Sequence, residues 1–328
     1  MIGVPLHPNS NNAKADVLII HTGALGDVIC ALTVIEYIFL QKTLDFCCQG
    51  HIAPILKHVP NIRNFFDINH SMMTSVFLSD MYPAVENWLR EYPLVLLFSF
   101  SKDWEDRLSK YHCNAVRIPP RPPVDEIIHT TQFIMDTLKR QKLVSKNNLR
   151  FQDFILQKNN QFNKMAISSK WKTVCLHPGS GSSFKNWPLL KYVSLSKQLK
   201  LMKYSVGWIL GPAENKMLNL LIQHNVNRDD IIQTNSIQTI MHYLSLSDHF
   251  VGNDSGISHL AAYLGMDSTV IFGPSDLRRW HPIGARVKTK PEDVTICSPC
   301  FEKGVRQCDH KKCFNSISVS QVIEQVES

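Results

Sequence analysis

Three short stretches of the chain combine glycine-containing turns with charged or hydroxyl side chains. The first begins with a predicted tight turn at Gly252 and Asn253, after a short apolar strand, and continues into a helix. Asp254 or Ser255 can cap this helix, and Gly256 has no Cβ to keep a ligand away from the backbone. A helix start offers free N–H groups and the positive end of the dipole, which bind anions. The stretch therefore predicts a phosphate site, although taken alone it is also typical of an ordinary strand, turn and helix.

The second stretch is a loop rich in glycine and serine that follows an apolar strand over residues 174–177. Its serines, Ser180 and Ser182, and its backbone N–H groups can contact phosphate oxygens. Lys185 follows, separated by one residue from a Trp-Pro pair that opens a helix. A lysine is most often a solvated surface residue, but this position predicts a cation beside the phosphate loop.

The third stretch is an apolar strand over residues 17–21, a glycine loop, and Asp27 at a helix start. The structural interpretation of Asp27 is a carboxylate that faces the helix dipole. The functional interpretation is a general base at the carboxyl edge of a parallel sheet, where open α/β folds bind their ligands. The glycine spacing is not that of the G-x-G-x-x-G fingerprint, which argues against a dehydrogenase.

Strands and helices alternate along both halves of the chain, which predicts an α/β protein with two doubly wound, Rossmann-like domains facing each other across a cleft. We place the N-terminal domain at residues 1–165 and the C-terminal domain at 166–328. Residues 151–170 are polar and form the predicted linker, with one strand at 151–156. A last helix, at about residues 317–326, is expected to pack back on the N-terminal domain.

Together, five motifs in register resemble glycosyltransferase family 9, the lipopolysaccharide heptosyltransferases of bacteria. The resemblance covers nearly the whole chain from about residue 16. The motifs are Leu25-Gly26-Asp27-Val28, the loop from His177 to Pro188, Gly211-Pro212-Ala213-Glu214, residues 252–262, and Phe272-Gly273-Pro274-Ser275.

The resemblance implies the GT-B architecture, with an acceptor-side N-terminal domain and a nucleotide-sugar-binding C-terminal domain. It also implies an inverting, metal-independent enzyme. Such an enzyme moves a heptose from an ADP-activated donor to a hydroxyl of the lipopolysaccharide inner core. In this chain Asp27 would be the catalytic base and Lys185 the cation for the leaving diphosphate. Asp254 would cap its helix or bind sugar hydroxyls, and Glu214 matches the ribose-binding carboxylate of the family. The predicted nucleotide-sugar contacts are Ser180, Ser182, Glu214, Asp254, Ser255, Gly256 and His259, the last of which can equally be a buried structural histidine.

No cofactor is required by this chemistry, and the sequence lacks the Asp-x-Asp motif with which metal-using glycosyltransferases hold a cation. The tail offers one alternative, a zinc site formed by Cys297, Cys300, Cys308 and Cys313. The spacing of the second pair is unusual for such a site. Reduced, partly buried cysteines in a compact loop explain the pattern equally well.

The chain has 328 residues and a formal net charge of +7, which suggests an acidic partner. An anionic lipid-linked glycan acceptor fits this charge, as does peripheral contact with the inner membrane. The candidate contributors are Arg278, Arg279, Lys288, Lys290, Arg121 and Lys102. The sequence has no basic helix with interleaved aromatic residues, so we expect no nucleic acid. It has neither a run of apolar residues long enough to span a membrane nor a signal peptide, and we expect a cytoplasmic protein with a loose leader over residues 1–16.

Three other functions compete with this one. The first is a related enzyme of the same architecture, either a glycosyltransferase with another donor sugar or acceptor or a nucleotide-sugar epimerase. The second is a catalytically silent protein that binds nucleotide sugars, which would have a broken base or phosphate loop. The third is a nucleic-acid binder, whose affinity would fall steeply with salt.

Overall fold

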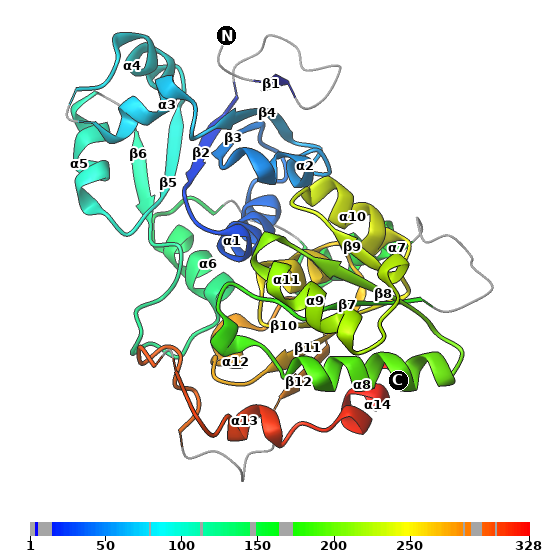
Figure 1. Ribbon diagram of the computed structural model, residues 1–328. Helices are drawn as coiled ribbons and strands as arrows, with labels where there is room; N and C mark the ends of the chain where they lie inside the picture. The colour runs from blue at the N-terminus through cyan, green and yellow to red at the C-terminus, as the bar shows by residue number, and fades with distance from the viewer. Residues whose placement is uncertain are drawn as a thin grey trace. The chain divides into compact units, whose positions relative to one another are not determined.

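The structure is a computed structural model that describes residues 4–5, 15–78, 80–111, 114–144, 149–163, 173–284, 286–289, 297–305 and 307–328. Contacts divide the chain into two compact units (Figure 1). The first unit consists of residues 1–122 and 130–148, and the second consists of residues 123–129 and 149–328. The predicted domain boundary at residue 165 stays a prediction, and part of the predicted linker, residues 164–170, lies outside the described residues.

The first unit is built on a sheet in the order β1-β4-β3-β2-β5-β6. The strands β2 to β6 are parallel, and β1 pairs antiparallel with β4 at the edge. Every residue of the central strand β2 is buried, which explains its uninterrupted apolar sequence. The strands are β1 Val4–Pro5, β2 Val17–His21, β3 Leu44–Cys48, β4 Ile62–Asp67, β5 Leu94–Phe98 and β6 Ala115–Ile118.

Helices join the parallel strands of this unit. α1 carries apolar residues through most of its length, and ten of its side chains are buried. The helices are α1 Leu25–Ile38, α2 Ala53–Leu56, α3 Ser71–Thr74, α4 Pro83–Arg90, α5 Lys102–Lys110 and α6 Thr130–Arg140.

The second unit has a fully parallel sheet in the order β12-β11-β10-β7-β8-β9. In chain order this is the doubly wound arrangement, in which the strand order reverses between β7 and β10. The strands are β7 Thr173–His177, β8 Ser205–Leu210, β9 Ile231–Gln233, β10 His249–Asn253, β11 Asp267–Phe272 and β12 Arg286–Thr289. The predicted α/β class with a doubly wound sheet in each half is confirmed.

The helices of the second unit are α7 Phe151–Asn163, α8 Leu189–Leu201, α9 Asn215–Gln223, α10 Ile237–Ser245, α11 Gly256–Tyr263, α12 Leu277–Trp280, α13 Lys312–Asn315 and α14 Val319–Glu327. The last helix, α14, lies beside α8 (Figure 1). Its apolar residues Val322, Ile323 and Val326 belong to the same buried cluster as Trp208 of β8. The apolar face of α14 is thus buried within the second unit, whereas the sequence suggested packing on the first domain.

Residues 151–156 form a helix, α7, and the predicted strand there is wrong. The spacing of Phe151, Phe154 and Lys158 places them on one helical face. Phe154 is buried, and the Lys158 ammonium lies 3.4 Å from the centre of the Tyr263 ring. These contacts with a neighbouring helix outweigh the polar composition of the segment.

The helix predicted from residue 125 begins only at Thr130. The reason is Arg279, whose guanidinium donates hydrogen bonds to the carbonyl oxygens of Pro123 at 2.7 Å and Val124 at 3.3 Å, and also to that of Glu126. Because these carbonyl groups accept from a side chain, they are held in a loop and do not form the hydrogen bonds of a helix.

The predicted leader over residues 1–16 is not wholly loose, since Val4–Pro5 pairs with β4.

Candidate functional site

The two predicted phosphate-binding segments of the second unit follow neighbouring strands. β7 and β10 pair in parallel, with Gly252 opposite His177. Ligands of doubly wound folds bind outside the carboxyl ends of the strands, at the point where the strand order reverses. That point lies between β7 and β10, so the fold brings the loop after His177 and the helix start after Asn253 together.

Lys185 and Asp254 form an ion pair across this point. Their Nζ and Oδ2 atoms are 3.0 Å apart, and the two side chains are only 15% and 9% exposed. The Lys185 ammonium also lies 5.2 Å from the centre of the Phe301 ring. Asp254 thus orients Lys185, and it does not cap the helix as the sequence suggested.

The cap of α11 is Ser255. Its hydroxyl accepts a hydrogen bond from the backbone N–H of Ser258 at 3.2 Å. Gly256 is the first residue of the helix, as predicted. Gly252 and Asn253 are the last residues of β10, however, and the predicted tight turn at these two positions is wrong.

The loop after β7 is held by its own side chains. The Ser180 hydroxyl lies 2.6 Å from Asn186 Oδ1 and 2.7 Å from the carbonyl oxygen of Ser182. It also accepts from the Ser182 N–H at 3.3 Å. Ser180 therefore shapes the loop that presents Lys185, and Ser182 takes part through its backbone.

Glu214 is brought to the start of the same loop. A Cβ atom at Gly179 would lie 2.1 Å from Glu214 Oε1, so only glycine fits between the loop and this carboxylate. The other oxygen, Oε2, accepts the Gly211 N–H at 2.8 Å. Glu214 is 5% exposed, and it lies four residues after the carboxyl end of β8.

The buried His259 and the partly buried His129 and His281 form a group near the ion pair. Burial lowers the pKa of His259 to about 4, and the nearby Asp254 carboxylate opposes that shift. Burial likewise lowers the pKa of His129 to about 4, while its Nε2 lies 2.9 Å from the carbonyl oxygen of His281. The rings of His129 and His281 are 4.5 Å apart. His259 is therefore a neutral, largely buried group near neutral pH, which leaves its predicted phosphate contact a proposal.

Asp27 lies in the first turn of α1, as predicted, at the carboxyl end of the central strand β2. The loop before it is supported by His21, whose Nδ1 accepts the Gly23 N–H at 3.0 Å. A Cβ at Gly23 would lie 2.6 Å from the His21 ring and 3.1 Å from the Asp27 Cβ. The His21 ring also stacks on Phe98, with ring centres 5.0 Å apart. The sequence did not predict these contacts of His21, because its position indicates only the last residue of an apolar strand.

The zinc site predicted as an alternative at the C-terminal cysteines receives no support from the described residues. Among the described residues, no three His, Cys, Asp or Glu side chains come close enough to hold a metal ion, which does not support zinc at Cys297, Cys300, Cys308 and Cys313. Burial raises the pKa of the Cys313 thiol to about 11, which favours a protonated side chain there.

The two arginines expected to face an anionic acceptor have other contacts. Arg278 forms a two-point pair with Asp276, at 2.9 and 2.7 Å, and Arg279 is buried against residues 123–126. The Arg278 side chain is 55% exposed but is paired with Asp276, whereas Arg279 is buried. Lys290 lies outside the described residues. In the parts of the chain that the structure covers, no helix is both long and apolar enough to span a bilayer.

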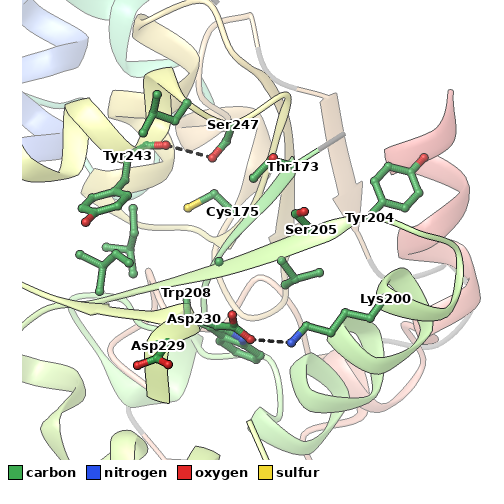
Figure 2. Close-up of a pocket in the computed structure, with 15 residues that line it drawn as sticks. Thr173, Cys175, Lys200, Tyr204, Ser205, Trp208, Asp229, Asp230, Tyr243 and Ser247 are labelled. Carbon is green, nitrogen blue, oxygen red and sulfur yellow. Dashed lines mark hydrogen bonds and ion pairs between the residues drawn. The ribbon is translucent and has the colours of Figure 1, made fainter. Parts of the chain in front are cut away.

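A cavity of about 600 Å³ lies elsewhere in the second unit. Its wall includes Thr173 and Ser205, the first residues of β7 and β8, together with Tyr243 and the Lys200–Asp230 ion pair (Figure 2). These residues mark the amino ends of the strands. The cavity is therefore separate from the loops that carry Lys185 and Asp254, and it contains no predicted site residue.

Residues 128–311 match the family model for glycosyltransferase family 9 (heptosyltransferase). The chain belongs to glycosyltransferase family 9. The matched part covers more than half of the chain, and it contains the Lys185 loop, Glu214 and the Asp254 helix start. The resemblance inferred from the five motifs is confirmed.

Individual relatives are distant from this family 9 chain. Lipooligosaccharide heptosyltransferase 2 of Campylobacter jejuni serotype O:2 is 25% identical over 172 residues, which are 51% of this chain and 53% of the relative. The chain thus spans about half the length of the curated relatives that it matches.

Solved structures share the fold over a longer stretch. Escherichia coli ADP-heptose lipopolysaccharide heptosyltransferase II is 16% identical, with a TM-score of 0.66 over 95% of this chain and 97% of that one. A family 9 glycosyltransferase of Veillonella parvula is 14% identical, with a TM-score of 0.69 over 95% of each chain. E. coli heptosyltransferase WaaC, solved with ADP, is 14% identical, with a TM-score of 0.65 over 95% of this chain and 98% of that one. At such identities the likeness shows the fold alone, and it confirms the predicted GT-B class.

Proposed function

We propose that this family 9 protein transfers a heptose from ADP-heptose to a hydroxyl of the lipopolysaccharide inner core, with inversion and without a metal ion. The observation that carries the proposal is the Lys185–Asp254 ion pair at the point where the strand order of the second sheet reverses. An oriented cation at this point suits the pyrophosphate of a nucleotide sugar.

Lys185 is the proposed electrophilic group. When the bond between the anomeric carbon and the phosphate oxygen breaks, the electron pair stays on the diphosphate, which gains negative charge. The ammonium has three N–H donors, and one of them is directed to Asp254. Asp254 thereby fixes the side chain so that the remaining donors can bind phosphate oxygens, together with the backbone amides of Ser255 and Gly256. Donors fixed in advance where charge develops are commonly the largest contribution to catalysis.

Asp27 is the proposed general base. The acceptor oxygen attacks the anomeric carbon from the side opposite the diphosphate, and its proton passes to the Asp27 carboxylate as the new bond forms. A single displacement of this kind inverts the anomeric centre. With Lys185 and two sets of backbone amides to hold the leaving group, the mechanism does not require a divalent ion.

The donor is proposed from both the residues and the relatives. Glu214, held beside Gly179, is the proposed partner of ribose hydroxyls, and Ser180, Ser182 and His259 complete the nucleotide-sugar contacts. ADP is the nucleotide found with E. coli WaaC, whose fold this chain shares. Another donor sugar on the same fold would use the same phosphate loop, so the sugar itself must be tested.

The proposed acceptor is an anionic lipid-linked glycan, which the net charge of +7 favours. In the first unit Phe100 is 57% exposed, and the Arg121 guanidinium lies 5.1 Å from the centre of its ring. An exposed aromatic ring beside a cation suits an amphiphilic, anionic ligand. We accordingly place the enzyme in the cytoplasm, at the inner face of the inner membrane, with no nucleic-acid partner.

Release of ADP from ADP-heptose tests the proposal, with deacylated inner-core lipopolysaccharide as acceptor and with EDTA present. We expect turnover by the wild-type protein, no turnover without acceptor, and an inverted anomeric linkage in the product. GDP-, UDP- and ADP-linked hexoses, assayed in parallel, report on another donor. Turnover only with one of these would replace the heptose assignment, and loss of turnover in EDTA that returns with Mg²⁺ would exclude the metal-independent route.

The silent-binder alternative makes a different prediction. Such a protein would bind ADP but would not release it from any donor, and Asp27→Asn would change nothing. A wild-type protein with ADP affinity and no turnover on any donor would therefore favour that alternative.

A further inference from the structure

Asn253 is the last residue of β10, and its side chain is completely buried between the two phosphate-binding segments. Its amide nitrogen donates to the carbonyl oxygens of Pro178 at 2.8 Å and Gly179 at 3.3 Å. Its amide oxygen accepts the Trp187 N–H at 2.9 Å and the Tyr192 hydroxyl at 3.1 Å. One side chain therefore contacts both ends of the loop that runs from Pro178 to Trp187.

These partners define the orientation of the amide. Two carbonyl oxygens face the nitrogen, and a backbone N–H and a hydroxyl face the oxygen. The reverse orientation would place like groups against each other at Pro178, Gly179 and Trp187, whereas the Tyr192 hydroxyl could also accept. Both N–H groups and both lone pairs of the buried amide are thereby used within the protein. Buried polar groups that are satisfied in this way make a structure specific and rigid.

The main chain of Asn253 connects the loop to the second phosphate segment. Its carbonyl oxygen accepts from the Ser258 hydroxyl in the first turn of α11. The next residue, Asp254, pairs with Lys185 in the middle of the loop. Residues 253 and 254, at the end of β10, thus contact both ends of the loop, Lys185 and the start of α11.

We propose that Asn253 is a positioning residue that holds the Lys185 loop in the shape that binds the donor diphosphate. The proposal rests on the proposed function for the identity of the ligand, and it adds a role that the sequence did not indicate. Asn253 itself need not contact the nucleotide. It acts by keeping the amides of the loop and the Lys185 ammonium at fixed positions relative to the start of α11.

Asn253→Asp is the sharpest test, because a carboxylate has almost the same shape as the amide. It retains acceptors for Trp187 and Tyr192, but it cannot donate to Pro178 and Gly179 and instead faces two carbonyl oxygens. Asn253→Ser is a neutral second variant, whose shorter side chain cannot reach both ends of the loop. The matched control is Tyr192→Phe, which removes one hydrogen bond to the same amide without touching the loop.

Two measurements are made on variants whose melting curves show them folded at the assay temperature. Hydrogen exchange followed by mass spectrometry reports on the amides of residues 180–187, and calorimetric titration reports the affinity for ADP. In both Asn253 variants we expect faster exchange in the loop and binding of ADP weaker by about tenfold, the effect of losing one or two hydrogen bonds. Tyr192→Phe should show neither change. In turnover assays the KM for the donor should rise in the Asn253 variants, and the KM for the acceptor should not.

Unchanged exchange of residues 180–187 in both Asn253 variants would overturn the proposal. So would ADP affinity within about twofold of the wild type in a folded variant, since that difference is only a few tenths of a kcal/mol. If the wild-type protein binds none of ADP, GDP, UDP and CDP, the proposed function fails instead. The exchange result then still decides whether Asn253 holds the loop.

Discussion

Removing the charge of Lys185 should lower both turnover and stability, through two separate effects. In Lys185→Met the methylene chain is largely kept and the ammonium is lost. The leaving diphosphate then lacks its proposed side-chain cation, and the loss of one oriented donor of this kind lowers kcat by about 10²–10³-fold. The stability cost arises from Asp254, which is 9% exposed and loses the partner at 3.0 Å. Leaving a largely buried carboxylate without its partner costs about 3–5 kcal/mol.

The second half of this prediction separates the two effects. Adding Asp254→Asn to Lys185→Met removes the uncompensated carboxylate, so the double variant should regain most of the lost stability and none of the lost turnover. Stability is measured from urea unfolding followed by tryptophan fluorescence, and turnover from ADP release at saturating donor. A double-mutant cycle gives the coupling between the two residues. Turnover of Lys185→Met within about threefold of the wild type would refute the catalytic role, since that corresponds to less than one kcal/mol of transition-state stabilisation.

Three further predictions concern other parts of the site. Asp27→Asn should lower kcat by about 10²–10⁴-fold, the usual contribution of a general base, and leave the KM for the donor unchanged in steady-state assays. Gly179→Ala should weaken ADP binding in calorimetry, because the new methyl group would lie 2.1 Å from Glu214 Oε1, and Glu214→Ala in the same chain should relieve the clash without restoring affinity. Burial lowers the pKa of His21 to about 3 and that of His259 to about 4, so both stay neutral in the folded protein while they bind protons in the unfolded chain below about pH 6.5. Their contribution to stability is therefore present above pH 6.5 and lost as the pH falls, and urea titrations at pH 6.5 and 4.5 should show a smaller decline for His259→Gln than for the wild type.

The sequence predicted the central parallel strands well because they are buried on both faces. β2, β3, β7 and β10 all lie in the interior of a sheet, where nearly every side chain must be apolar. Such runs, bounded by turn residues, are typical of parallel strands. The doubly wound class then followed from their regular alternation with helices.

The errors occurred where contacts distant in the sequence decide the local structure. The helix start at residue 125 was shifted to Thr130 because Arg279 binds the carbonyl groups of residues 123–126, more than 150 residues away along the chain. The strand predicted at residues 151–156 became a helix that places Lys158 over Tyr263. No local pattern can report such partners.

The site shows the same division. Lys185, Asp254 and Glu214 were predicted from their motifs, and the structure brings them to one end of the second sheet. The pairing of Lys185 with Asp254 was not predicted, because a carboxylate at a helix start suggests a cap. Asn253 was interpreted as a turn residue, since asparagine after glycine is typical of turns, whereas its four partners are distributed over residues 178–192.

Both units place their proposed reactive groups at the same point of the same topology, but with opposite charges. In the first unit the chain order of strands reverses between β2 and β5, and Asp27 stands in the first turn of the helix after β2. In the second unit the order reverses between β7 and β10, and the helix after β10 begins with an uncharged cap, Ser255. A helix start favours negative charge in either case. In the first unit the negative charge is that of Asp27, the proposed base. In the second unit the helix start carries no acidic side chain and is the proposed binding position of the ligand phosphates, beside the Lys185 ammonium that Asp254 orients. One fold, used twice, thus offers the proposed carboxylate for the acceptor and the proposed anion site for the donor, and the difference depends on which residue occupies the first turn.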